Sequence, residues 1–179
     1  MKKITLIFVL LFFIQYTKAQ DTCATAVPIT AGFYVVDAIN GTQVPTPLCD
    51  SQYGAVPTTR PPGGEWYIYT PTENHSVTVT TDLSVNVPLR DTRFHVYRGT
   101  CDNLICYEGD DDSGAGNSST STFDVIAGTS YYIAFDNRWT SLGFTFQLSE
   151  NVFVPPPCSF ATVVTAGTTT VAALDEDNT

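Results

Sequence analysis

Short stretches of alternating hydrophobic and polar residues recur along the chain, with glycine and proline between them. In one stretch Val77 and Val79 alternate with threonines, and in another Phe144, Phe146 and Leu148 stand two residues apart. Because successive side chains of a strand point to opposite faces, this period of two predicts β-strands with one buried face. No stretch shows the period of a helix.

The alternating stretches predict eight strands: Phe33–Ile39, Trp66–Thr70, Ser76–Thr81, Arg93–Arg98, Leu104–Glu108, Thr122–Ile126, Ser130–Asp136 and Phe144–Ser149. Many short strands, each with one apolar face, are typical of an all-β domain in which two antiparallel sheets pack as a sandwich. We expect Trp66 and Tyr69 in the core and His95 as a polar residue on a half-exposed strand.

A ten-residue stretch that begins at Cys23 returns at Cys158, at an offset of 135 residues, and Val36 falls on Val171. Self-similarity at a fixed offset indicates a modular array. The prediction is a β-sandwich module at 20–153, a Pro-rich linker at 154–157 and the start of a second, truncated repeat at 158–179.

Residues 1–19 have the pattern of a secretory signal peptide, with two lysines, an apolar run and small residues before the expected cleavage after Ala19. The mature chain would then hold five arginines, no lysine and eighteen carboxylates, a formal charge of −13. This balance argues against nucleic acid and anionic membranes as partners. We expect a secreted or cell-surface protein without a membrane span in its mature part.

Five cysteines leave one unpaired, and four cysteines allow three pairings. Spacing and the repeat predict that Cys23 pairs with Cys49 and that Cys101 pairs with Cys106 across a hairpin tip. Cys158, the counterpart of Cys23, would stay unpaired within this chain.

A dense acidic loop runs from Gly109 to Gly114 and contains three consecutive aspartates. A hairpin of strands 93–98 and 104–108 would place this loop beside Asp91, and a hairpin of 122–126 and 130–136 would bring Asp136 to the same end. Converging carboxylates favour Ca²⁺, which takes six to eight oxygen ligands. The alternative is a solvated turn with arginine counter-charges. The predicted calcium ligands are Asp91, Asp110, Asp112 and Asp136, with Asp111 as a weaker candidate.

Asn137, Arg138 and Trp139 follow the seventh predicted strand. A tryptophan beside an amide and a guanidinium can stack on a sugar ring, so these three residues are a candidate ligand-binding group. The alternative is that Trp139 packs as a lid on the edge of the sandwich. The chain shows no nucleophile–base motif and no paired-histidine metal motif, so we expect no enzymatic activity.

Four stretches come in a familiar order: residues 91–97, the acidic loop at 109–114, residues 127–133 and residues 143–146. In this order they resemble the bacterial pre-peptidase C-terminal (PPC) type of domain, over about residues 23–150. The resemblance implies a jelly-roll-like β-sandwich that serves secreted enzymes and surface proteins as an accessory module. It also implies calcium at the acidic loop in some relatives, and an association with type IX secretion for tandem modules.

These observations predict a non-catalytic extracellular module for adhesion, binding or spacing within a larger protein. Its partners would be an extracellular polymer or a surface glycan or protein, together with neighbouring repeat modules of the same polypeptide. Two alternatives are an accessory module of a secreted hydrolase, whose catalytic domain lies outside this chain, and a carbohydrate-binding module. An exposed Trp139 on a flat or grooved face would favour the last of these.

Overall fold

The structure, a computed structural model, describes residues 20–49 and 63–151, together with the backbone of two further strands at 162–165 and 168–171. The predicted signal peptide at 1–19, the linker at 154–157 and Cys158 lie outside the described residues.

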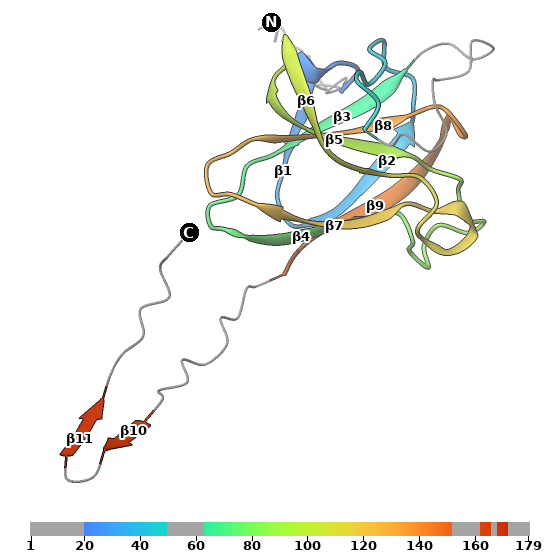
Figure 1. Ribbon diagram of the computed structural model, residues 1–179. Coiled ribbons are helices and arrows are strands. Elements are labelled where there is room, and N and C mark those ends of the chain that lie inside the picture. The colour runs from blue at the N-terminus through green and yellow to red at the C-terminus, as the bar shows by residue number, and fades with distance from the viewer. Residues whose placement is uncertain (1–19, 50–62, 152–161, 166–167, 172–179) are drawn as a thin grey trace, which may run out of the picture.

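Two sheets face each other and form a sandwich, as the alternating pattern predicts (Figure 1). One sheet has five strands in the order β1-β3-β8-β5-β6, and the other has four in the order β2-β9-β4-β7. Their bounds are β1 Val27–Ile29, β2 Gly32–Ala38, β3 Gly64–Tyr69, β4 His75–Thr80, β5 Phe94–Thr100, β6 Asn103–Asp110, β7 Thr120–Val125, β8 Tyr131–Asp136 and β9 Leu142–Asn151. All eight predicted strands are present. The short β1, which pairs parallel to β3, escaped prediction because three residues are too few to show a period.

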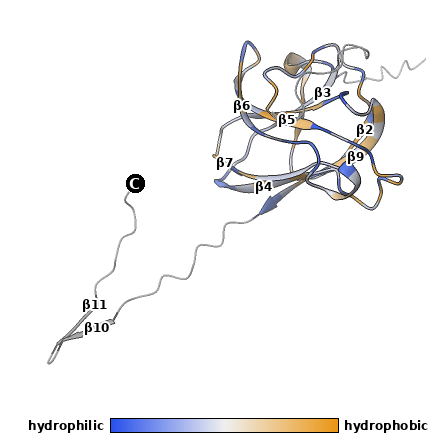
Figure 2. Ribbon diagram, turned by 45° about the vertical axis from the view of Figure 1, so that its right-hand side comes forward, coloured by the Kyte–Doolittle hydropathy of each residue, from blue (hydrophilic) through white to orange (hydrophobic). Residues whose placement is uncertain are grey.

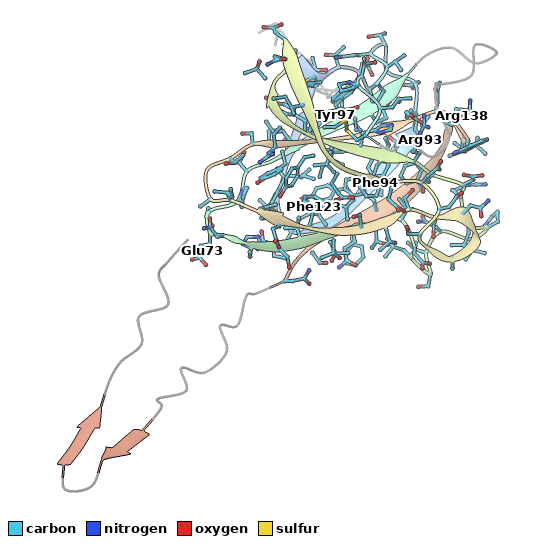
Figure 3. All side chains as sticks on the ribbon, viewed as in Figure 1. Glu73, Arg93, Phe94, Tyr97, Phe123 and Arg138 are labelled. Atoms are coloured by element: carbon cyan, nitrogen blue, oxygen red, sulfur yellow. A yellow bond between two sulfur atoms is a disulfide. The ribbon has the colours of Figure 1, made fainter. Side chains whose placement is uncertain are left out.

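The main core fills the space between the two sheets. Tyr67 and Phe135 from the five-stranded sheet meet Phe146 from the other sheet, with ring centroids 4.8 and 4.9 Å from the Phe146 ring. Phe94 and Phe123 lie in the same layer, as Figure 3 shows. Aromatic side chains bury large apolar areas, so this layer supplies much of the hydrophobic stabilisation.

A second hydrophobic cluster covers the outer face of the five-stranded sheet. Trp66 and Tyr97, both fully buried, stack there with ring centroids 5.7 Å apart. The segment from residue 20 to 26 lies against them: the Trp66 amide donates to the Gln20 carbonyl, and the Cys23 amide donates to the Gln43 side chain. Both faces of β5 are therefore buried from Phe94 to Tyr97, so this part of the strand is not half-exposed.

Two disulfides tie this outer layer to the β5–β6 hairpin. Cys23 pairs with Cys101 and Cys49 pairs with Cys106, with Cα atoms 5.6 and 5.1 Å apart. The four predicted half-cystines are correct, but the predicted pairing is wrong. Spacing along the chain favoured the nearest partners, whereas both N-terminal cysteines lie on segments that cross the outer face of the five-stranded sheet.

The chain reversal between β7 and β8 is not the expected hairpin. β7 pairs with β4 in one sheet, and β8 pairs with β3 and β5 in the other. The reversal still brings Asp136 to the end of the sandwich where β6 finishes, because β5 runs antiparallel to both β6 and β8. The predicted end of the sheet is therefore right, although the connection differs.

The two further strands, β10 (Thr162–Thr165) and β11 (Thr168–Val171), pair with each other in an antiparallel ladder. Shifted back by the offset of the sequence repeat, they fall on β1 and on the first part of β2. This second pair of strands thus lies at the repeated places in the sequence. Its pairing differs, because β1 and β2 hydrogen-bond to β3 and β9 in separate sheets, and no described strand offers such partners to β10 and β11.

Candidate functional site

A buried ion pair lies where β5 begins and β8 ends. Arg93 and Asp136 have exposures of 0% and 1%, and the Arg93 Nε donates to the Asp136 Oδ2 over 2.9 Å. The two residues are neighbours because the Asp136 amide also donates to the Arg93 carbonyl, which continues the β5–β8 ladder. Figure 3 shows Arg93 and Arg138 at this end of the sandwich.

His95 completes this buried cluster. Its Nδ1 accepts a hydrogen bond from the Cys49 amide over 3.1 Å, so the ring proton lies on Nε2, which donates to the Asp136 Oδ2 over 3.0 Å. Burial would raise the pKa of the Asp136 carboxyl, but the His95 hydrogen bond and the Arg93 guanidinium outweigh it and lower the pKa. The expectation of a half-exposed His95 is wrong, because the outer layer covers it completely.

The Asp136 carboxylate, one of the predicted calcium ligands, is thus buried and engaged by hydrogen bonds within the protein. Its second oxygen accepts the backbone amide of Arg138 over 2.9 Å. A carboxylate with both oxygens bonded to neighbouring donors serves to hold the ends of β5 and β8 together. The structure does not bring Asp136 into the acidic cluster described next.

Three carboxylates gather at the same end of the sandwich. Asp91, Asp111 and Asp112 each offer an oxygen, and these oxygens all lie within 4.8 Å of one another. Asp91 precedes β5, and the other two follow β6, so the antiparallel β5–β6 hairpin places them side by side. Asp111 is buried, Asp91 is half-buried and Asp112 is exposed, which gives the cluster a buried base and an open side.

Asp110 turns away from this cluster and caps the loop. Its carboxylate accepts the backbone amides of Ser113 and Thr120, over 3.1 and 2.7 Å, and the Ser113 hydroxyl. The loop also needs Gly114, because its amide donates to the Ser118 carbonyl and a Cβ there would collide with the Ser118 hydroxyl. We expected Asp110 and Asp112 to share a side by strand alternation, but β6 ends at Asp110 and the alternation ends with it.

Trp139 lies against the acidic loop, which agrees with the lid alternative. Its indole Nε1 donates to the Asp111 Oδ2 over 3.0 Å, and the Arg138 guanidinium stacks over its ring at 4.5 Å. Trp139 is half-buried, and Asn137, with an exposure of 4%, is buried. The three predicted ligand-binding residues are therefore adjacent to the acidic cluster, and the indole N–H orients one of its carboxylates.

A buried hydroxyl network supports the cluster from below, and sequence reasoning did not find it. The Thr81 and Thr92 hydroxyls are 2.7 Å apart, and the Ser119 hydroxyl lies 3.0 Å from that of Thr92. The Ser119 hydroxyl also donates to the Asp111 carbonyl over 2.9 Å. This network joins the strand ends of both sheets to the loop. Isolated Ser and Thr residues in a Thr-rich chain give no sequence signal for it.

Glu65 is a second buried carboxylate that the sequence did not reveal. Its Oε1 accepts the backbone amides of Asn40 and Gly41, over 2.9 and 3.1 Å. Burial raises its pKa, and the two amide hydrogen bonds only partly oppose this rise. The role of Glu65 is to satisfy the turn that follows β2.

No protein-family model and no curated protein matches this chain. The described part of the chain contains no helix that is both long and apolar enough to span a lipid bilayer.

Proposed function

We propose that this chain is a secreted, non-catalytic binding module of a larger extracellular protein, and that it holds a calcium ion at Asp91, Asp111 and Asp112. The observation that carries the proposal is the convergence of these three carboxylates within 4.8 Å at one end of a sandwich. Oxygen ligands of this kind suit Ca²⁺, and water would supply the remaining ligands. A bound cation would remove the repulsion between three carboxylates held so close together.

Secretion is supported by two kinds of observation. The first nineteen residues have the pattern of a signal peptide, and two disulfides cross-link the described domain. Disulfides form and persist in oxidising compartments. The order of motifs that resembles the PPC type of domain fits the same location and a role as an accessory module.

A non-catalytic role is supported by the state of the two histidines. His95 has no exposed surface, and both of its ring nitrogens are engaged by Cys49 and Asp136. His75 is hydrogen-bonded to the Tyr69 hydroxyl, which in turn donates to Glu150. A general base must reach a substrate proton, and the fully buried His95, with both ring nitrogens engaged, cannot do so. Binding or spacing is therefore the function that this sandwich supports best.

The experiment is thermal unfolding of the mature chain with calcium and with chelator. At a calcium concentration of one hundred times Kd, binding adds about 2.7 kcal/mol, or on the order of 10 °C for a domain of this size. We expect the shift in wild type and its loss in Asp91→Asn/Asp112→Asn. Asp124→Asn, an exposed carboxylate on β7, is the matched control and should keep the full shift.

The variant Asp110→Asn distinguishes this set of calcium ligands from the set predicted from sequence, because only the predicted set contains Asp110. It should lower the melting temperature in both conditions, because it weakens the loop cap, and it should leave the calcium shift intact. No shift in wild type, or an equal shift in Asp91→Asn/Asp112→Asn, would reject the site.

A further inference from the structure

The outer face of the four-stranded sheet is divided into two unlike halves. Over β4 and β7 it carries threonine pairs, such as Thr78 and Thr122, whose hydroxyls lie 2.7 Å apart. Over β2 it exposes Phe33 and Val35, which lie two residues apart on one face with 65% and 67% of their surfaces open (Figure 2). Apolar surface gathered on one part of a face is the usual mark of an interaction site.

A loop adds a second apolar wall to this half of the face. Val85 and Val87, with exposures of 65% and 83%, line a cavity of about 270 Å³ together with Val35. The floor is formed by Gly143 and Thr145 of β9. We call this feature the β2–β9 trough.

The side chain of Asn86 makes the hydrogen bonds to β9 that a neighbouring strand would otherwise make. β4 pairs with β9 only from Gln147 onward, so the backbone of Thr145 has no strand partner on that side. The Asn86 side chain fills this place: its Nδ2 donates to the Thr145 carbonyl over 2.7 Å, and its Oδ1 accepts the Thr145 amide over 2.8 Å. Asn86 is buried, so the loop wall is fixed beside β9.

At the floor of the trough, Gly143 allows β9 to approach the backbone of β2 closely. A Cβ at this position would collide with the carbonyl oxygens of Val36 and Asp37, so only glycine fits. The result is a shallow channel with apolar walls and a small-residue floor.

Two opposite charges line the same cavity. Asp37 continues the exposed face of β2 beyond Val35, and Arg90 ends the loop wall. Within the described residues, neither side chain takes part in a hydrogen bond or an ion pair. A ligand that meets both charges must carry an anion and a cation on either side of an apolar group.

We propose that the β2–β9 trough binds a peptide segment of a partner protein, with one apolar side chain inserted between Val35 and Val87 and flanking charges paired with Asp37 and Arg90. The cavity is smaller than the roughly 300–1,000 Å³ of sites for drug-sized ligands, so it suits a single side chain. A second copy of the chain is disfavoured because each mature chain carries a formal net charge of −13. An anionic lipid would face Asp37 and the same net charge.

A peptide site at the β2–β9 trough rests on the proposed binding function and adds to it a second surface and the chemistry of its partner. The test is an NMR titration of ¹⁵N-labelled mature protein with capped tripeptides that hold leucine between arginine and glutamate, in both orders. We expect amide shifts at residues 35–37, 85–87, 89–90 and 143–145, and none with glycine in place of leucine. Titrations are run in calcium and in chelator, because Arg90 directly precedes Asp91 of the acidic cluster.

Val87→Ser and Asp37→Asn should each weaken the binding, Val87→Ser by about tenfold or more, as expected for the loss of a buried apolar contact. Ile105→Ser removes another exposed apolar residue, on β6 and outside the trough, and should bind like wild type. Peptide shifts that Val87→Ser does not change would overturn the proposal, as would their absence in both conditions. A concentration-dependent dimer in sedimentation that Val35→Ser abolishes would also overturn it, in favour of a second copy. The calcium melting experiment tests different residues, so the calcium proposal and the peptide proposal can each fail independently of the other.

Discussion

The carboxylate of Asp136 interacts with two buried side chains that can carry positive charge. It neutralises the fully buried Arg93 and fixes the tautomer of the fully buried His95. Breaking a buried ion pair by removing one partner is costly because it leaves an uncompensated charge in a region of low polarity. The same carboxylate that sequence reasoning assigned to a metal therefore has a structural role.

We predict that Asp136→Asn destabilises the domain by about 3–5 kcal/mol at neutral pH, because it removes the carboxylate that pairs with the buried Arg93. Urea denaturation of both proteins measures this difference. Asp124→Asn removes an exposed carboxylate and should change the free energy of unfolding by less than about 0.5 kcal/mol. Equal effects of the two substitutions would show that the buried pair contributes little.

The pH dependence of the free energy of unfolding is a second measurement of the contribution of Asp136. The folded-state pKa of Asp136 lies below its ordinary value of 3.8, so its contribution is fully present above that pH. The contribution is lost as the pH falls through the folded-state pKa. The stability of wild type should therefore decline more steeply below about pH 4 than that of Asp136→Asn. Parallel curves would contradict the lowered pKa.

At the scale of elements, the two disulfides link distant parts of the chain to the five-stranded sheet, as strand pairing does elsewhere in the sandwich. They attach Cys23, at the start of a short 3-10 helix, and Cys49 to the β5–β6 hairpin. The attached segments cover Trp66 and Tyr97. The covalent links thus add to the hydrogen bonds that hold these segments over the outer hydrophobic cluster.

We predict that Cys23→Ala/Cys101→Ala and Cys49→Ala/Cys106→Ala each destabilise the domain by about 4 kcal/mol. The bridges join residues 78 and 57 positions apart, and long closed loops restrict the unfolded chain most. Thermal unfolding measures the loss, and non-reducing peptide mapping checks the pairing. Cys158→Ala is the control and should change neither result. A fragment that links Cys101 to Cys106 would contradict the pairing.

At the scale of the whole molecule, the sandwich and the β10–β11 pair are separate hydrogen-bonded units. Every strand of the two large sheets finds its partners between Gln20 and Asn151. The sandwich therefore contains its own core and both of its disulfides.

We predict that a chain of residues 20–151 folds as a single cooperative unit and melts within about 2 °C of the chain of residues 20–179. Domains with a complete core fold independently of attached segments. Calorimetry of both chains measures the difference. A broad transition, or a melting temperature lower by more than about 5 °C, would show that residues after 151 stabilise the sandwich.

The sequence alone determined the class of fold and most strand positions. Alternation is a local property, because neighbouring residues of an extended chain must point to opposite faces. It therefore assigned Val77 and Val79, and likewise Phe144, Phe146 and Leu148, to buried strand faces, and all five lie in the main core. It also indicated that the acidic loop lies at the same end of the sheet as Asp91, since this follows from one hairpin.

Only the tertiary structure decided what covers each face and which side chains meet. His95 is buried because segments far away in sequence cross the outer sheet, and the cysteines pair across those same segments. Asp111 replaces Asp110 in the acidic cluster because the strand ends there and the chain turns. Such contacts depend on packing between segments separated by tens of residues, and a local pattern carries no information about that packing.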